Sequence, residues 1–184
     1  DRLLAVGPDE IQLGLLKRLR GAPIAQSTDA FAMVYEPAAP YSVVQTSAVN
    51  ADDIRYFKRV ARYWDLMANS GRFALGLGLL FKLAPVSSAF MRFWAFSDFL
   101  WARQRRTDCL SPEMLMDELY AYLCGQGLSP GDVRAALLVD YVQSKGNNQP
   151  VCLVGHLPRQ TAAQRKRSVR LTKRQRQHAQ QEVR

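Results

Sequence analysis

Residues 52–72 read DDIRYFKRVARYWDLMANSGR, and this stretch decides the fold class. Its apolar side chains recur at the spacing of an α-helix, so one stripe of that helix would face a core while most basic residues turn away. The stripe consists of Ile54, Phe57, Ala61, Trp64 and Ala68, and the basic residues are Arg55, Lys58, Arg59 and Arg62. The pattern predicts an amphipathic helix packed on a larger helical domain.

Both ends of this helix carry recognisable signals. Asn50 is a suitable N-cap, and Asp52 and Asp53 suit the positive end of the helix dipole. At the other end, Asn69-Ser70-Gly71 predicts a stop, because glycine accepts the left-handed conformation that often follows a helix.

Four further helices are expected downstream. A short apolar helix over residues 73–83 contains Gly76 and Gly78 and ends at Pro85. Ser87 or Ser88 opens the next helix, which is apolar nearly all round and is therefore expected at the centre of the helical cluster. Its apolar residues are Phe90, Phe93, Trp94, Phe96, Leu100 and Trp101. Ser111-Pro112 and Ser129-Pro130 open the last two helices.

A small β part precedes these helices. Residues 10–17 alternate in the manner of a mostly buried strand, and a β-hairpin with a proline-bounded loop is expected over residues 31–45. The strand has no evident partner within the chain. The expected fold is mainly α with a small β part: one strand left over from a barrel, a hairpin, about five helices and a basic tail.

Composition limits the function classes. The chain has 184 residues and 48% hydrophobic content, which is enough for a core of its own. It starts at Asp1 without a signal peptide, so we expect a segment of a longer chain, with a processed terminus as the alternative. Three scattered cysteines favour reduced thiols in the cytoplasm. No membrane span is expected, and contact with a membrane surface is the alternative for the apolar stretch 73–101.

The net charge of +9 is concentrated at the C-terminus. Residues 159–184 contain nine Lys and Arg and one acidic residue, so this tail holds +8 of the total. Weak, nonspecific contact with nucleic acid through the tail is one interpretation, and a solvated terminus is the other. We expect no nucleic-acid binding beyond this, since no aromatic residues interleave with the charges.

Motifs of common active sites are missing from the sequence. The cysteines are 15 and 28 residues apart, which fits neither a zinc nor an iron–sulfur spacing. Cys152 and His156 are four residues apart, but two ligands do not hold zinc. No serine–histidine–aspartate pattern is visible, and Gly76-Leu77-Gly78 lacks the third glycine of a phosphate-binding loop. We therefore expect no catalytic residue, metal ligand or cofactor site in this segment.

Four stretches resemble a known family. Residues 11–24, IQLGLLKRLRGAPI, resemble a late barrel strand of cobalamin-binding radical SAM proteins, with Ala22 in place of the usual threonine. Residues 62–73, RYWDLMANSGRF, resemble a block in the uncharacterised C-terminal domain that follows the barrel in one subgroup. The hairpin Met33–Thr46 and residues 96–101, FSDFLW, are similar as well. The resemblance covers roughly residues 3–145.

The resemblance implies a bacterial, cytoplasmic parent enzyme with a cobalamin-binding domain and a radical SAM barrel. That barrel would hold a four-iron four-sulfur cluster on a C-x-x-x-C-x-x-C motif upstream of this chain, together with SAM. The segment alone would be inactive, and its partner would be the upstream barrel of the same chain. The implied domains are the end of the barrel (1–27), a helical C-terminal domain (28–158) and the tail (159–184).

Candidate binding residues follow from the same placement. Three residues lie on or just after the expected barrel strand, whose C-terminal end is where barrels bind ligands: Gln12, Lys17 and Arg18. Five more are candidates for a substrate pocket: Tyr35, Arg62, Tyr63, Asn69 and Arg72. For those near the helix end, capping and surface solvation are the alternative.

Two functions stay open at this point. The first is the C-terminal part of a cobalamin-dependent radical SAM enzyme, which would shape or cover the substrate site of the barrel. The reaction could be a methyl transfer or a rearrangement. The second is a non-catalytic helical interaction module whose basic tail contacts nucleic acid or an acidic surface.

Overall fold

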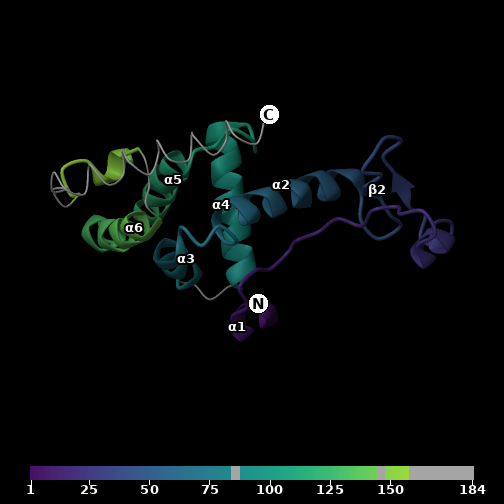
Figure 1. The fold of residues 1–184 in the computed structure, drawn as a ribbon, viewed down its shortest axis with the longest axis horizontal. Helices are drawn as coiled ribbons and strands as arrows, with labels where there is room; N and C mark the ends of the chain where they lie inside the picture. The colour runs from purple at the N-terminus through teal and green to yellow at the C-terminus, as the bar shows by residue number, and fades with distance from the viewer. Residues whose placement is uncertain (84–87, 145–147, 158–184) are drawn as a thin grey trace, which may run out of the picture. The chain divides into compact units, whose positions relative to one another are not determined.

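The computed structural model describes residues 1–83, 88–144 and 148–157. Five of its helices have eight residues or more: α2 (Ala51–Met67), α3 (Ala74–Phe81), α4 (Ala89–Gln104), α5 (Pro112–Gly125) and α6 (Pro130–Ser144). The short elements are α1 (Arg2–Val6), the 3-10 turns η1 (Pro23–Ser27) and η2 (Val151–Leu153), and the strands β1 (Val34–Tyr35) and β2 (Val43–Gln45). The expected mainly α fold with a small β part is confirmed (Figure 1).

The helix starts that the sequence predicts are found in place. Asn50 accepts a hydrogen bond from the backbone N–H of Asp53 at 2.9 Å. Ser88 and Ser111 cap α4 and α5 in the same way. Gly71 follows α2 with a φ of 66°, the left-handed conformation expected after this helix. Pro85, Ser87 and the basic tail lie outside the described residues.

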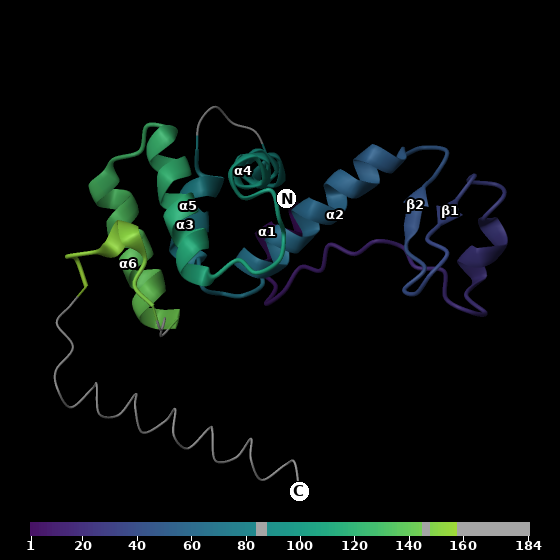
Figure 2. The ribbon, with the colours of Figure 1, turned by 90° about the horizontal axis from the view of Figure 1, so that it is seen from above.

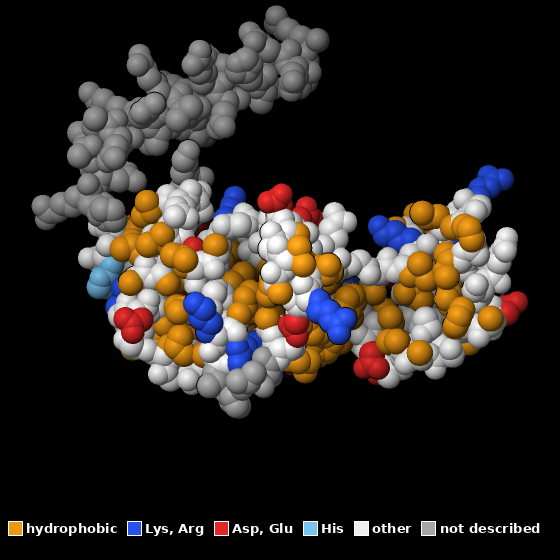
Figure 3. Space-filling model, turned by 90° about the horizontal axis from the view of Figure 1, so that it is seen from below, with side chains coloured by type: hydrophobic (Ala, Val, Ile, Leu, Met, Phe, Trp, Pro, Cys, Tyr) orange, Lys and Arg blue, Asp and Glu red, His pale blue; other side chains and the backbone are white. Residues whose placement is uncertain are grey.

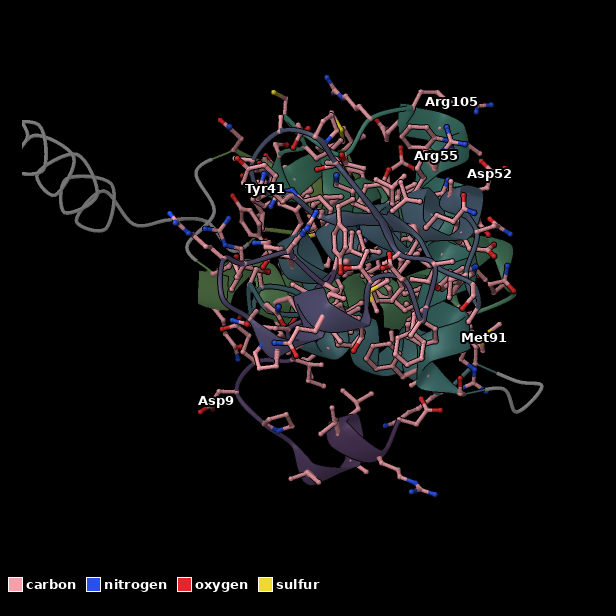
Figure 4. All side chains as sticks on the ribbon, turned by 90° about the vertical axis from the view of Figure 1, so that its right-hand side faces the viewer. Asp9, Tyr41, Asp52, Arg55, Met91 and Arg105 are labelled. Carbon is pink, nitrogen blue, oxygen red and sulfur yellow. The ribbon has the colours of Figure 1, made fainter. Side chains whose placement is uncertain are left out.

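The core forms where α4 contacts α2, α3 and α5, and where α3, α5 and α6 contact one another (Figure 2). One face of α4 is fully buried through Phe93, Phe96, Ser97 and Leu100. Its opposite side is open, and Met91 on that side is 52% exposed (Figure 4). α4 therefore contacts three other helices, as expected for the centre of the cluster, but these neighbours cover one of its faces only.

The buried stripe of α2 also differs from the expected one. The residues that it buries are Val60, Tyr63, Trp64 and Met67, so Trp64 alone is shared with the predicted stripe. The core packs against the C-terminal half of α2, which leaves Ile54 and Phe57 half-buried. Arg59, expected to face solvent, is largely buried, with its guanidinium carbon 3.9 Å from the centre of the Tyr56 ring. The same side chain forms an ion pair with Asp98 on α4 at 2.5 Å.

The hairpin is confirmed, whereas the strand expected over residues 10–17 is not formed as such. β1 and β2 pair antiparallel, with Val34 opposite Gln45. Residues 10–17 run without regular structure apart from one antiparallel bridge between Lys17 and Ser42. The backbone N–H of Val43 donates to the carbonyl of Leu16 at 2.8 Å. The segment therefore does find a partner within the chain, along the side of β2 that β1 does not occupy.

A buried carboxylate joins α6 to the start of α3. Asp140 is 2% exposed, and its two oxygens accept the backbone N–H groups of Leu75 and Gly76 at 3.0 and 2.8 Å. A Cβ at Gly76 would approach Leu137 and Leu119 to 2.7 and 2.8 Å. Glycine at this position thus allows α3 to lie close to α5 and α6.

Within the part of the chain that the structure describes, no helix combines the length and the apolarity that crossing a bilayer requires.

Candidate functional site

The eight predicted binding residues do not form one site. Asn69, Tyr63 and Arg62 belong to α2 or the turn after it, while Lys17, Arg18 and Tyr35 lie at the hairpin. Gln12 and Arg72 are exposed, and Gln12 bonds only to Glu10 among the described residues. The structure thus separates two groups of predicted residues. The α2 group is Arg62, Tyr63 and Asn69, and the hairpin group is Lys17, Arg18 and Tyr35.

The α2 group holds the main chain of Ile11. The Trp64 indole N–H donates to the Ile11 carbonyl at 2.9 Å, and the Asn69 amide donates to the same oxygen at 3.3 Å. The Ile11 N–H in turn donates to Asn69 Oδ1 at 3.2 Å. Both polar groups of one extended residue are therefore satisfied by side chains at the end of α2. These contacts join two of the stretches named above, residues 11–24 and residues 62–73.

Tyr63 and Arg62 have structural partners. Tyr63 is fully buried, and its hydroxyl donates to the carbonyl of Arg106 at 2.8 Å. Burial raises the pKa of this phenol, so it stays a hydrogen-bond donor. Arg62 pairs with Asp65 at 3.0 Å and lies 3.7 Å from Asp108. The interpretation of capping and surface solvation fits Arg62, while Tyr63 belongs to the core.

The hairpin group borders a surface hollow of about 430 Å³. Arg18 lies at one side with its guanidinium carbon 5.8 Å from the centre of the Tyr35 ring. Thr28 and Tyr41 line the same hollow, and Tyr41 is 47% exposed. Lys17 is exposed beside it and pairs through its backbone with Ser42. Two predicted residues, Arg18 and Tyr35, are thus brought together with residues that the sequence did not single out.

A second hollow, of about 370 Å³, lies beside α1 and is mainly apolar. Leu3 and Leu4 of α1 face Ile11 and Leu13 there, with Trp64 and Phe90 completing the lining. Leu3 is 66% exposed. The side chain of Asp1 accepts the backbone N–H of Phe90 at 3.1 Å, which ties this end of the chain to α4.

Exposed apolar side chains gather in the first part of the chain. Among the described residues, eight of the fourteen large apolar side chains that are exposed belong to residues 1–49: Leu3, Val6, Leu16, Leu19, Phe31, Val34, Tyr41 and Val49. Figure 3 shows orange side chains spread over the hairpin end of one face, with charged groups mostly at its margin. Among the described residues, the first 49 positions therefore expose more large apolar side chains than the rest of the chain does.

The three cysteines differ in exposure. Cys109 is exposed in a loop, whereas Cys124 and Cys152 are half-buried on α5 and η2. Burial, followed by the hydrogen bond with Asp117, raises the pKa of Cys152 to about 12, so it is a thiol at neutral pH. In the described ranges, no three His, Cys, Asp or Glu side chains are grouped as metal ligands would be.

Sequence reasoning missed Tyr41 and Asp140. Tyr41 has a φ of 56°, and the motifs give no warning of a left-handed tyrosine. Asp140 reads as an ordinary polar position on a helix, because its two donors lie 64 and 65 residues away. The one available signal was Gly76 inside an apolar helix, which indicates close approach of a neighbour.

The comparisons with known proteins identify a family. A family model described as a protein of unknown function, DUF4080, matches residues 29–184. The match covers most of the chain, so this protein belongs to the DUF4080 family. No curated protein matches, and no solved structure matches either.

Proposed function

We propose that this chain is the C-terminal part of a cobalamin-dependent radical SAM enzyme, in which it covers or shapes the substrate site of the upstream barrel. The proposal rests first on the resemblance of residues 11–24 and 62–73 and on their order in the chain. Membership of the DUF4080 family is compatible with it but names no activity.

One observation carries the proposal. Residues 11–18, which resemble a barrel strand, are fastened at one end to the end of α2 and at the other to the hairpin: Ile11 bonds to Trp64 and Asn69, and the Arg18 N–H donates to the carbonyl of Tyr41 at 2.9 Å. The side chains of Leu16 and Leu19 nevertheless remain 38% and 61% exposed. A segment that is held by its backbone and leaves Leu16 and the following Leu19 exposed is suited to lie between this domain and another layer.

The chemistry of the parent enzyme is assigned to other residues. The described part of this chain offers no cluster of metal-ligating side chains, so its residues do not fit an iron–sulfur cluster. The proposal therefore places the cluster, SAM and cobalamin on upstream domains, and no step of the reaction is derived from residues of this chain.

The test uses the natural full-length protein. Under the proposal, its sequence contains a C-x-x-x-C-x-x-C motif upstream, and the protein reconstituted with iron and sulfide without oxygen cleaves SAM to 5′-deoxyadenosine. A full-length protein that lacks such a motif would rule the radical SAM assignment out.

Paired variants test the role of this domain separately. Leu19→Asp places a charge among the exposed apolar residues near the hairpin, and Val142→Asp places one on α6, where Val142 is 52% exposed. We expect Leu19→Asp to lower SAM cleavage with the cluster absorbance unchanged, and Val142→Asp to leave both unchanged. Equal activity of the two variants would contradict contact between this surface and the barrel.

A further inference from the structure

The hollow at the hairpin is built from three separate segments. Arg18 comes from the extended segment, Thr28 from the turn after η1, and the hairpin supplies Met33, Tyr35 and Tyr41. Its volume of about 430 Å³ falls in the range of small-molecule sites. The hollow is large enough for one ring with an attached charged group.

The hollow is lined by one cation, Arg18, and one carboxylate, Glu36, and among the described residues only the carboxylate has an ion-pair partner. Within the described part of the chain, Arg18 forms no ion pair, and its exposed side chain contacts the ring of Tyr35. The carboxylate that lines the hollow, Glu36, is paired with Lys58 at 3.1 Å. The N–H groups of the Arg18 guanidinium are therefore available to an anion.

Tyr41 presents a ring from a fixed backbone. Its N–H donates to the Ala38 carbonyl and its own carbonyl accepts from the Arg18 N–H, both at 2.9 Å. Its φ of 56° is uncommon for a bulky residue and costs on the order of 1 kcal/mol. Burial of the side chain does not offset this cost, because Tyr41 is 47% exposed (Figure 4). Strain kept at an exposed aromatic residue beside a free arginine points to a binding role.

We propose that this hollow binds a small planar organic anion, with its ring against Tyr41 and its anionic group on Arg18. Guanidinium groups bind carboxylates and phosphates through paired N–H donors. Tyrosine rings stack with flat rings in offset or edge-on geometry. The site is defined by residues of this chain alone, so the proposal holds whether or not the chain follows a radical SAM barrel.

Equilibrium dialysis of the natural full-length protein tests the anionic half of the site. The probes are phenyl phosphate and benzoate, which distinguish the two anionic groups, with benzyl alcohol as the neutral ring. We expect Arg18→Gln to weaken binding of the preferred anion about tenfold, the effect of losing a hydrogen bond to a charged group. Arg20→Gln removes the same charge two residues away and is expected to change binding less than twofold. If both variants weakened anion binding equally, the binding would reflect general attraction to a basic segment, and the proposed site at Arg18 would be wrong.

The aromatic half needs its own variant. Tyr41→Asn removes the ring, while asparagine tolerates the left-handed backbone, so the hairpin is expected to remain folded. This variant should lose binding of phenyl phosphate, and inorganic phosphate should bind the wild-type protein more weakly than phenyl phosphate does. Unchanged phenyl phosphate binding by Tyr41→Asn, or equal binding of the two phosphates, would overturn the proposal.

Discussion

Between residues 51 and 153 the large apolar side chains build a common core, whereas residues 1–49 contribute Val43 alone to it within the described part of the chain. Residues 51–153, the helical body, bury rings such as Phe93 and Phe96 completely. The first region is instead held to the body by the hydrogen bonds of Ile11 and by the ion pair between Glu36 and Lys58. Within the region, residues 16–18 bond to the hairpin, and Leu3, Leu16 and Leu19 stay exposed. The two regions therefore differ in what holds them: a buried apolar core in residues 51–153, and mainly polar contacts in residues 1–49, where several large apolar side chains stay exposed.

The largest expected effect comes from comparing one ring in each region. Phe96→Ala removes a fully buried ring that packs against Phe93 and Tyr122, with centroids 6.2 and 5.1 Å away. We expect it to lower the free energy of unfolding by about 3–5 kcal/mol. Phe31→Ala removes a ring that is 52% exposed, and a change of about 0.5 kcal/mol or less is expected. Urea unfolding followed by circular dichroism measures both, and similar losses would erase the contrast between the regions.

The next effect concerns the buried carboxylate of the body. Asp140→Ala leaves the N–H groups of Leu75 and Gly76 without their acceptor inside the core. We expect a loss of about 2–3 kcal/mol in the free energy of unfolding, since an unsatisfied buried donor costs its desolvation. Asp132→Ala, at an exposed position in the first turn of α6, is the control and should cost less than about 1 kcal/mol.

The same residue predicts a pH dependence. Burial raises the pKa of Asp140, although its two backbone donors oppose the shift. A carboxyl whose pKa is higher in the folded state stabilises the fold below its unfolded value of 3.8, and this contribution is lost as the pH rises through the folded value. The stability of the wild-type protein relative to Asp140→Asn should therefore fall as the pH is raised from 3 toward neutrality, as measured by urea midpoints. A difference that grows with pH would show that the two N–H donors outweigh burial.

The sequence predicted the body better than the first region, for a physical reason. Helix caps such as Asn50 and Ser111 act within three residues, so local pattern suffices to find them. The buried stripe of α2 was misjudged because burial depends on which half of the helix its neighbours cover. The strand predicted over residues 10–17 was wrong, because alternation of apolar and polar residues does not show whether a neighbouring strand pairs with the whole segment. Arg18 and Tyr35, both predicted as binding residues, border the same hollow, while the left-handed backbone of Tyr41 depends on contacts that no local pattern encodes.

Alanine substitutions at two glycines of α3 should change the stability of the body by smaller amounts and in opposite directions. A Cβ at Gly76 would press on Leu119 and Leu137, which are both fully buried, so Gly76→Ala should destabilise by about 1–2 kcal/mol. A Cβ at Gly78 meets nothing within 4 Å, so Gly78→Ala should stabilise by about 0.5–1 kcal/mol through helix propensity. Thermal unfolding of the two variants separates them by the sign of the shift. Stabilisation by both would mean that α3 can move away from α5 and α6.

The smallest change in the free energy of unfolding is expected for the hydrogen bonds between Asn69 and Ile11, which link the two regions. Their loss should be seen mainly at Ile11 itself. Asn69→Ala removes the side chain that accepts the Ile11 N–H and donates to the Ile11 carbonyl. Trp64 still donates to the same carbonyl, so the free energy of unfolding should fall by only about 0.5–1 kcal/mol. The Ile11 amide itself loses its acceptor and should exchange with deuterium much faster than in the wild-type protein.

Arg72→Ala is the matched control for this link, because Arg72 is exposed in the same turn and its side chain makes no hydrogen bond within the described residues. Exchange at Ile11 should be unchanged in that variant. Faster exchange at Ile11 in Asn69→Ala with intact helices would show that this link is local and can be lost without unfolding the body. If the amides of the helices also exchanged faster in Asn69→Ala, residues 1–49 would unfold together with the helical body. The contrast between the two regions would then not hold.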